Sequence, residues 1–178
     1  EKVKGKKKKQ KEKKSGFAKN LFQLTVNVGW RRFEYRQGRA GWHPKLLLWP
    51  LLQRLVAKGV LDKLGGRLRL AVSGGAALPP AIAKLFIGLG LNLVQGYGLT
   101  ETSPVICVNR PDDNVPESIG TILPGAEVKL GENEELLTQS PYVMLGYWQN
   151  PTATQDMIDE QGWLHTGDKA RIDEQGHL

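Results

Sequence analysis

The stretch best suited to chemistry spans residues 91–102, Leu-Asn-Leu-Val-Gln-Gly-Tyr-Gly-Leu-Thr-Glu-Thr. Its first residues form a short apolar run of leucine and valine, which predicts a buried strand. A Gly-Tyr-Gly turn centred on Tyr97 follows and brings Thr100 and Glu101 to the end of that strand. Ligands of α/β sheets bind beyond the carboxyl ends of the strands. A hydroxyl and a carboxylate at this place therefore predict a nucleotide site.

A second glycine-rich segment is expected beside the first. Residues 67–72 are predicted to form a strand that leads into Ser-Gly-Gly-Ala at residues 73–76. Two prolines can then open a helix whose apolar stripe is Ile82, Leu85, Phe86 and Leu89. Strand, loop, helix and strand make a βαβ unit with parallel strands. Both strand ends then face the same way, so residues 73–76 should lie beside residues 96–101.

A third polar motif occupies residues 162–168, Gly-Trp-Leu-His-Thr-Gly-Asp, and is expected to be a turn. The carboxylate of Asp168 can accept two hydrogen bonds, which suits a ribose diol. Around this motif, turn residues separate short alternating stretches, as in a small antiparallel sheet. The stretches predicted as strands are 118–123, 126–130, 135–139 and 169–172, with a short helix over residues 150–158.

Helical spacing dominates the chain ahead of these motifs. The residues Phe17, Leu21, Leu24 and Val28 recur at that spacing and predict a helix. A glycine-rich break follows at residues 37–44, and a second helix is expected to begin near Pro50. Its predicted inner face consists of Leu51, Leu52, Leu55 and Val56.

The formal charge of +7 depends on one segment. Residues 1–14 hold nine of the 25 basic residues and two of the 18 acidic ones, which leaves 16 of each sign in the remainder. Like charges repel, so the lysine-rich stretch 2–14 is expected to be extended or only weakly helical. No aromatic residue interleaves with its lysines to stack on bases, which favours a solvated linker over a nucleic-acid site.

The cysteine count suits a reducing compartment, and the hydropathy pattern predicts no membrane span. The single Cys107 cannot form an internal disulfide, and no cluster of Cys and His has zinc spacing. The longest apolar run, residues 46–52, is far below the roughly 20 residues of a membrane span. No signal peptide is visible. We therefore expect a cytoplasmic protein, with peripheral association at a membrane left open.

Each motif taken alone has an ordinary structural explanation. A Ser-Gly-Gly sequence is more often a tight turn than a ligand loop, and an aspartate in Thr-Gly-Asp often forms a turn. Glu101 lies between two threonines and can take part in local hydrogen bonding. The pair Gly96 and Gly98 lacks the third glycine of a dinucleotide fingerprint, so an NAD site is not expected.

Taken together and in order, the motifs resemble a known family. Ser73–Ala76, Gln95–Glu101, the Tyr142–Thr154 stretch with its Gly-Tyr-Trp, and Gly162–Asp168 follow the order of the AMP-forming acyl-CoA synthetases. The resemblance extends from about Phe17 to the end of the chain. Residues 62–69, Asp-Lys-Leu-Gly-Gly-Arg-Leu-Arg, preceded by a helical insertion, look most like the long-chain fatty-acid branch.

The resemblance implies a role for each matching residue. Adenine would lie between Gly74, Gly75 and Ala76 on one side and Gly96, Tyr97 and Gly98 on the other, and Gln95 also counts among the nucleotide-binding residues. Thr100 and Glu101 would be catalytic, Thr100 at the α-phosphate and Glu101 as the Mg²⁺ ligand. Asp168 would bind the ribose. The co-substrates would be ATP, a fatty acid and coenzyme A, and no nucleic-acid partner is implied.

Attack of a carboxylate on the α-phosphorus of ATP brings two anions together. Such a reaction needs charge neutralisation and alignment more than a general base. The residue types that the resemblance assigns to the phosphate and metal fit this need.

The predicted fold class is α/β: an N-terminal helical segment, a parallel βαβ unit, and a small antiparallel β-rich subdomain. The expected divisions are a lysine-rich linker over residues 1–15, a helical and α/β part over 16–115, and the β-rich part over 116–178. The family's phosphate loop and its C-terminal lid with a catalytic lysine have no counterpart here. We therefore expect an internal, inactive piece of a long-chain acyl-CoA synthetase.

Two alternatives stay open. One is another adenylate-forming ligase, such as an acyl-ACP synthetase or an aryl-CoA ligase. The other is a non-enzymatic module that binds nucleic acid or anionic lipid through its basic tail.

Overall fold

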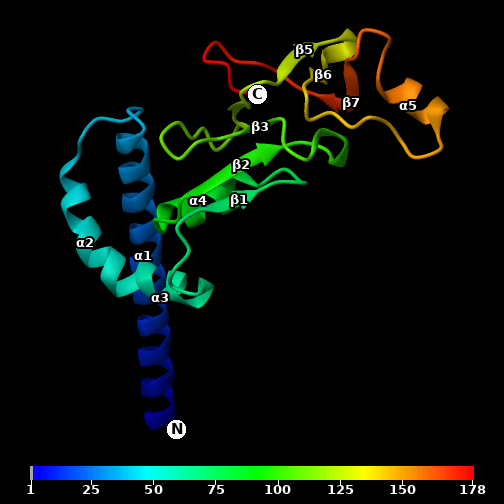
Figure 1. Ribbon diagram of the computed structural model, residues 1–178. Coiled ribbons are helices and arrows are strands. Elements are labelled where there is room, and N and C mark those ends of the chain that lie inside the picture. Colours follow the sequence, from blue (N-terminus) through cyan, green and yellow to red (C-terminus); the bar gives the residue numbers. More distant parts are fainter. Residues whose placement is uncertain (1) are drawn as a thin grey trace. The chain divides into compact units, whose positions relative to one another are not determined.

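The computed structural model describes the backbone of residues 2–178 and the side chains from residue 16 onward (Figure 1). The chain divides into two compact units. Unit 1 comprises Glu1–Ala71 and Ala81–Leu93, and unit 2 comprises Val72–Pro80 and Val94–Leu178. Each unit has an apolar cluster of its own.

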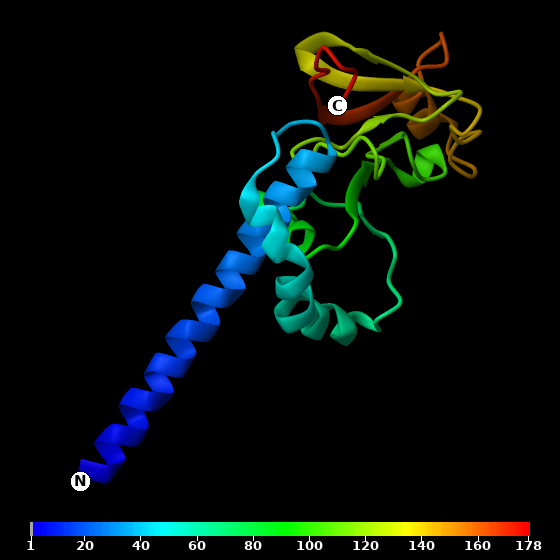
Figure 2. The same cartoon turned by 90° about the vertical axis from the view of Figure 1, so that its left-hand side faces the viewer.

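Unit 1 is helical. Helix α1 covers Lys2–Arg36, and a second helical run follows as η1 (Pro44–Leu48), α2 (Trp49–Leu52), the π-helical turn η2 (Gln53–Ala57), α3 (Lys58–Leu61) and η3 (Asp62–Leu64). Figure 2 shows this second run alongside the later part of α1. The core between them consists of Val26, Val28, Trp49, Leu52, Ala57 and Leu89. A Cβ atom at Gly29 would overlap the carbonyl oxygen of Gly88, so α1 and the end of α4 (Pro80–Gly88) approach closely.

The buried faces of unit 1 differ from those predicted. Of the residues at predicted helical spacing in α1, Val28 is buried and Leu21 packs against the core, whereas Phe17 is 71% exposed; Thr25 and Val26 are buried as well. In the second run Trp49 and Leu52 are buried, whereas Leu51 and Leu55 face solvent. The stripe predicted for α4 is correct in part, because Leu89 is buried and Leu85 packs against the core, but Ile82 is 40% exposed and Ala83 and Ile87 are buried instead. A wide band of apolar residues on one short helix does not show which part of the band contacts a neighbour.

The prediction of an extended or weakly helical segment at residues 2–14 was wrong for the backbone, because α1 begins at Lys2. Lysine is a good helix former, and the segment continues a helix that is anchored by tertiary packing further along. The side chains of residues 1–15 lie outside the described part of the chain. Among the helices of residues 2–178, none combines the length and hydrophobicity needed to cross a bilayer.

The predicted βαβ arrangement is confirmed. Strand β1 (Ala71–Ser73), helix α4 and strand β2 (Leu93–Tyr97) follow one another, and β1 lies next to β2 in a mixed sheet of order β1-β2-β3-β4. Strand β3 (Cys107–Val108) runs antiparallel to β2 and pairs Cys107 with Tyr97. Strand β4 (Thr121–Ile122) completes the sheet. The chain after β2 forms the 3-10 turn η4 (Thr100–Thr102).

A second sheet of three antiparallel strands confirms the β-rich part. Its order is β5 (Glu127–Leu130), β6 (Glu135–Gln139) and β7 (Leu164–Lys169), and β5 and β6 are joined by η5 (Glu132–Glu134). Helix α5 (Pro151–Met157) begins after Asn150, whose side chain accepts a hydrogen bond from the backbone N–H of Ala153.

The predicted turn at residues 162–168 and strand at 169–172 were wrong. Strand β7 covers most of that motif and pairs with β6, with Leu164 fully buried. Cross-strand pairing and burial therefore override the turn preference of Thr-Gly-Asp.

Candidate functional site

A cavity of about 390 Å³ lies within unit 2 at the end of β2. Most of its lining residues come from the loop after β1, from β2 and the turn that follows it, and from the end of β7. The lining residues are Gly75, Ala76, Ala77, Gln95, Gly96, Tyr97, Gly98, Leu99, Ile119, Leu136, Asp168, Lys169 and Ala170. Three segments that are far apart in the sequence thus surround one space large enough for a small molecule.

The cavity brings together most of the residues singled out from the sequence. Seven of the predicted nucleotide-binding residues line it, with the glycine loop on one side and Tyr97 with Asp168 on another. Gly74 does not line the cavity but lies against its wall, because a Cβ atom there would be 3.3 Å from the carbonyl oxygen of Gly96. Thr100 and Glu101 do not line it and occupy η4, directly after the Gly98-Leu99 wall.

Gln95 is 8% exposed and has both ends of its amide engaged. Its Oε1 atom accepts a hydrogen bond from the backbone N–H of Leu78 at 3.0 Å. Its Nε2 atom donates to the carbonyl oxygen of Pro116 at 2.6 Å. The side chain therefore ties the loop after β1 to the end of β2, which positions one wall of the cavity.

Tyr97 and Asp168 meet at the cavity. The phenol of Tyr97 donates a short hydrogen bond to Oδ2 of Asp168, which joins β2 to β7. Burial raises the pKa of Tyr97, and the hydrogen bond to Asp168 raises it further. A carboxylate has acceptor capacity for more than one donor, so Asp168 can still accept bonds from hydroxyl groups of a ligand.

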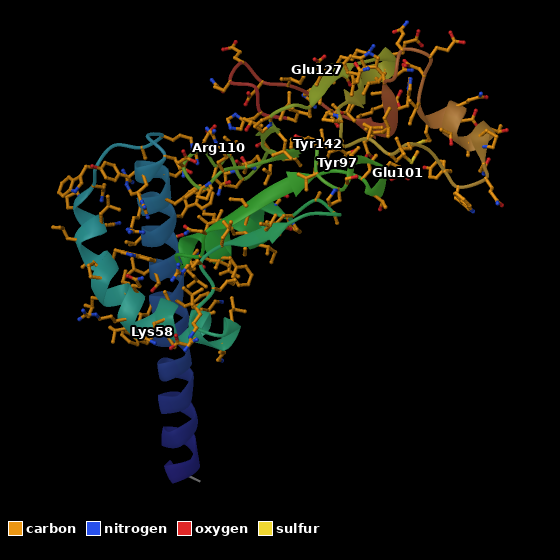
Figure 3. All side chains as sticks on the ribbon, in the orientation of Figure 1. Lys58, Tyr97, Glu101, Arg110, Glu127 and Tyr142 are labelled. Carbon is orange, nitrogen blue, oxygen red and sulfur yellow. The ribbon has the colours of Figure 1, made fainter. Side chains whose placement is uncertain are left out.

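Glu101 is held from two sides. Its backbone carbonyl accepts a hydrogen bond from the N–H of Met144 at 2.7 Å. Its Oε1 accepts one from the phenol of Tyr147, also at 2.7 Å. The bond from Tyr147 is the largest cause that lowers the pKa of Glu101. Glu101 is therefore presented as a carboxylate of fixed orientation; Figure 3 labels it beside Tyr97.

Gly98 is required by a close approach of the chain. A Cβ atom at this position would overlap the carbonyl oxygen of Pro104, which follows the η4 turn. The turn itself is fixed by Thr102, which is 1% exposed and whose hydroxyl bonds both the N–H and the carbonyl of Leu99. Glycine at Gly98 and a buried threonine thus let the chain reverse immediately after the cavity.

Sequence reasoning missed two kinds of site residue. The lining of the cavity also includes Ile119, Leu136, Lys169 and Ala170, which lie in no motif, and Leu99 and Ala77, to which no role was given. The partner of Glu101, Tyr147, was quoted only as part of a motif. A tyrosine separated from Glu101 by 46 positions gives no local signal of that contact.

Glu101 offers a single carboxylate as a ligand for Mg²⁺. Within the described residues, no group of three or more His, Cys, Asp and Glu side chains could hold a metal ion. Mg²⁺ in nucleotide enzymes is bound by one or two carboxylates together with substrate phosphates. A single carboxylate oriented by the hydrogen bond from Tyr147 fits that pattern. It does not fit a permanent protein-only metal site.

Comparison with known proteins identifies the class. The family profile described as "AMP-binding enzyme" matches residues 9–148. The chain belongs to this family of adenylate-forming enzymes. The predicted resemblance to it is thereby confirmed.

The curated proteins that the chain is similar to include fatty-acid–CoA ligases. A putative fatty-acid–CoA ligase, fadD11, from Mycobacterium tuberculosis is 38% identical over 131 residues, or 73% of this chain and 23% of the relative. A long-chain-fatty-acid–CoA ligase from Salmonella typhimurium is 44% identical over 123 residues, or 62% of this chain and 22% of the relative. The chain thus spans less than a quarter of the length of these curated relatives.

A solved structure agrees in fold. The anthranilate CoA ligase AuaEII, crystallised with anthranoyl-AMP, has a TM-score of 0.57 and is 33% identical, over 64% of this chain and 24% of that one. The fold comparison therefore leads to the same class of enzyme as the sequence comparison.

Proposed function

We propose that this chain supplies the adenosine-binding part of a long-chain fatty-acid–CoA ligase. The observation that carries the proposal is the cavity in unit 2, where the Gly75-Ala76 loop, Tyr97 and Asp168 surround one space. Backbone next to glycine lets a flat base approach closely, Tyr97 offers a ring face, and Asp168 offers acceptors for a diol. The fatty-acid–CoA ligases among the relatives support the acid and thiol substrates.

In this proposal each residue has a defined task. Gly74, Gly75 and Ala76 lie on one side of the adenine and Gly96, Tyr97 and Gly98 on the other. Gln95 holds the glycine loop in place rather than contacting the base through its amide, because both amide ends are already bonded. Asp168 binds the ribose, and Thr100 contacts the α-phosphate.

Glu101 would hold Mg²⁺ together with the phosphates of ATP. The bound ion supplies neutralisation of the negative charge between the fatty-acid carboxylate and the α-phosphate. The chain's own contribution is orientation: the phenol of Tyr147 orients the Glu101 carboxylate, and the N–H of Met144 holds the backbone carbonyl of Glu101.

We also propose that the 178-residue chain alone does not form acyl-AMP. The resemblance assigns the grip on pyrophosphate and the catalytic lysine to segments without a counterpart in this sequence. The acceptor thiol belongs to coenzyme A or to an acyl carrier protein. Assays of the full-length ligase with each acceptor would identify which of the two receives the acyl group.

Isothermal calorimetry on the chain tests the proposal. AMP should bind, GMP should bind at least about tenfold more weakly, and ATP should bind no more than a few-fold more tightly than AMP. Equal binding of AMP and GMP would contradict the adenine site. ATP bound at least about a hundredfold more tightly than AMP would mean that residues of this chain grip the outer phosphates.

A further inference from the structure

Charge is divided unequally between the two units. Unit 1 contains 21 Lys and Arg against 4 Asp and Glu, a formal charge of +17, and unit 2 contains 4 against 14, a formal charge of −10. The balance of 16 basic and 16 acidic residues beyond residue 14 therefore conceals a strong separation. Unit 1 keeps 12 basic and 2 acidic residues even when residues 1–15 are left out.

The two acidic side chains of that part of unit 1 are already paired within the unit. Glu34 forms an ion pair with Arg39 at 3.1 Å, and Asp62 forms one with Lys58 at 2.6 Å. The 12 basic and 2 acidic residues of this part of unit 1 give it a net formal charge of +10. A partner of this surface is therefore expected to be anionic.

An apolar stripe lies on the same unit. Leu47, Leu51 and Leu55 recur every four residues along the second helical run, a spacing that aligns side chains on one helix face. They are 73%, 57% and 63% exposed, while Trp49 and Leu52 on the opposite face are buried. Three large apolar side chains in a row on solvent are unusual for a monomer surface and mark an interaction site.

Cations occur on the same helical run as this stripe. Lys45, Arg54 and Lys58 are exposed on the same helical run, and Lys58 is labelled on α3 in Figure 3. Trp42, in the loop just ahead of the run, is 58% exposed. Leucines with flanking Lys and Arg, together with a tryptophan, are the composition of helices that lie in a membrane interface.

We propose that the exposed face of Pro44–Leu64 is a docking surface for an anionic lipid membrane, with Leu47, Leu51 and Leu55 entering the headgroup boundary. Nucleic acid fits less well, because leucines do not stack on bases as aromatic side chains do. A symmetric contact with a second copy through this face fits less well, since two strongly basic copies of unit 1 repel each other. The inference rests on unit 1 alone and does not depend on the proposed nucleotide site.

The test is co-sedimentation of the full 178-residue chain with vesicles. The chain should bind vesicles of phosphatidylcholine with 30% phosphatidylglycerol at about 50 mM salt, and at least about tenfold more weakly to pure phosphatidylcholine. Raising the salt to about 500 mM should weaken binding to the anionic vesicles by at least about tenfold.

Two matched variants separate the stripe from general hydrophobicity. The triple variant Leu47→Gln, Leu51→Gln, Leu55→Gln keeps good helix formers and alters only exposed residues, so its circular dichroism spectrum should match that of the parent. It should bind anionic vesicles at least about tenfold more weakly. The control variant Leu130→Gln, Leu145→Gln, Ile172→Gln removes three exposed apolar residues of unit 2 and should bind normally.

A charge variant completes the design. Lys45→Gln with Arg54→Gln should weaken vesicle binding by about fivefold per cation. Unchanged binding by the leucine triple, or equal binding to neutral vesicles, would overturn the proposal. Oligonucleotide binding of the same affinity in the parent chain and the leucine triple variant would identify nucleic acid as the partner instead. A concentration-dependent dimer that the triple abolishes would identify a second copy.

Discussion

The phenol of Tyr147 donates a hydrogen bond of 2.7 Å to Oε1 of Glu101, which joins the segment ahead of α5 to the turn after β2. Tyr147 is itself held in place, because its backbone N–H donates to the hydroxyl of Thr154 at 2.9 Å. That hydroxyl in turn donates to the carbonyl of Asn150, the cap of α5. The start of α5 thus positions Tyr147, and Tyr147 orients the carboxylate proposed to hold Mg²⁺.

Removing this phenol should raise the pKa of Glu101. The bond from Tyr147 is the largest cause that lowers it, so Tyr147→Phe should shift the carboxyl titration, followed by NMR, to higher pH. A lowered pKa contributes stability above the unfolded value of about 4.3, and this contribution is lost as pH falls through the folded value. The variant should therefore lose less stability on acidification. Tyr142→Phe, whose hydroxyl bonds Pro124 instead, is the control and should leave Glu101 unchanged.

The charge of Glu101 should be essential in the full-length ligase. Glu101→Gln keeps nearly the same volume and can still accept the bond from Tyr147, but it removes the charge proposed to bind Mg²⁺. Acyl-AMP formation, measured as pyrophosphate release, should fall by about two orders of magnitude or more. Nearly normal release would remove Glu101 from the reaction. Glu127→Gln, an exposed carboxylate on β5 labelled in Figure 3, serves as the control.

Tyr97 should make stability depend on alkaline pH. Burial raises its pKa in the folded chain, so the unfolded phenol, with a pKa of about 10, loses its proton first. The resulting stability is fully present below pH of about 10 and declines as pH rises above it. Urea unfolding at several pH values should show a shallower alkaline decline for Tyr97→Phe. An unchanged decline would mean that Tyr97 is not the buried phenol responsible.

The sequence predicted which residues share the cavity better than it predicted the contacts around them. The Gly-Tyr-Gly turn and the glycine loop were recognised because glycines follow strands there, and local patterns report such features. Asp168 also lines the cavity, but it lies within β7 and not in the expected turn. Strands β5 and β6 also follow from short alternating stretches, whereas the residues of β7 were mostly expected to form a turn. Contacts between distant segments, such as Glu101 with Tyr147, leave no such pattern.

Helix faces were predicted less well for a physical reason. The run from Leu46 to Leu55 is apolar on most sides, so helical spacing allows several inner faces. Tertiary packing selects Trp49 and Leu52, and it leaves Leu51 and Leu55 exposed. The distribution of charge was not predicted either. A total over the chain cannot show that cations and carboxylates fall in different units.

Gln95 should be important for stability. Gln95→Leu keeps the volume but leaves the N–H of Leu78 and the carbonyl of Pro116 without their partner, at a cost of about 1–3 kcal/mol for the buried Pro116 carbonyl and less for the part-buried N–H of Leu78. Urea unfolding should show this loss. Gln139→Leu is the matched control, because its amide bonds the carbonyl of Gln161 at an exposed position where water can replace it. Equal losses for the two variants would mean that the Gln95 bridge has no special role.

Asp168 offers the sharpest test of the cavity. Hydrogen bonds to charged groups contribute about 1.5–3 kcal/mol, and solvent at the exposed Asp168 favours the lower end of that range. At about 1.4 kcal/mol per decade, Asp168→Asn should weaken AMP binding by about tenfold in calorimetry. The same variant should bind adenine, which lacks the ribose, as the parent chain does. Asp156→Asn, an exposed carboxylate of α5 outside the cavity, should bind both ligands normally. A loss of adenine binding equal to the loss of AMP binding would mean that Asp168 shapes the cavity instead of holding the ribose.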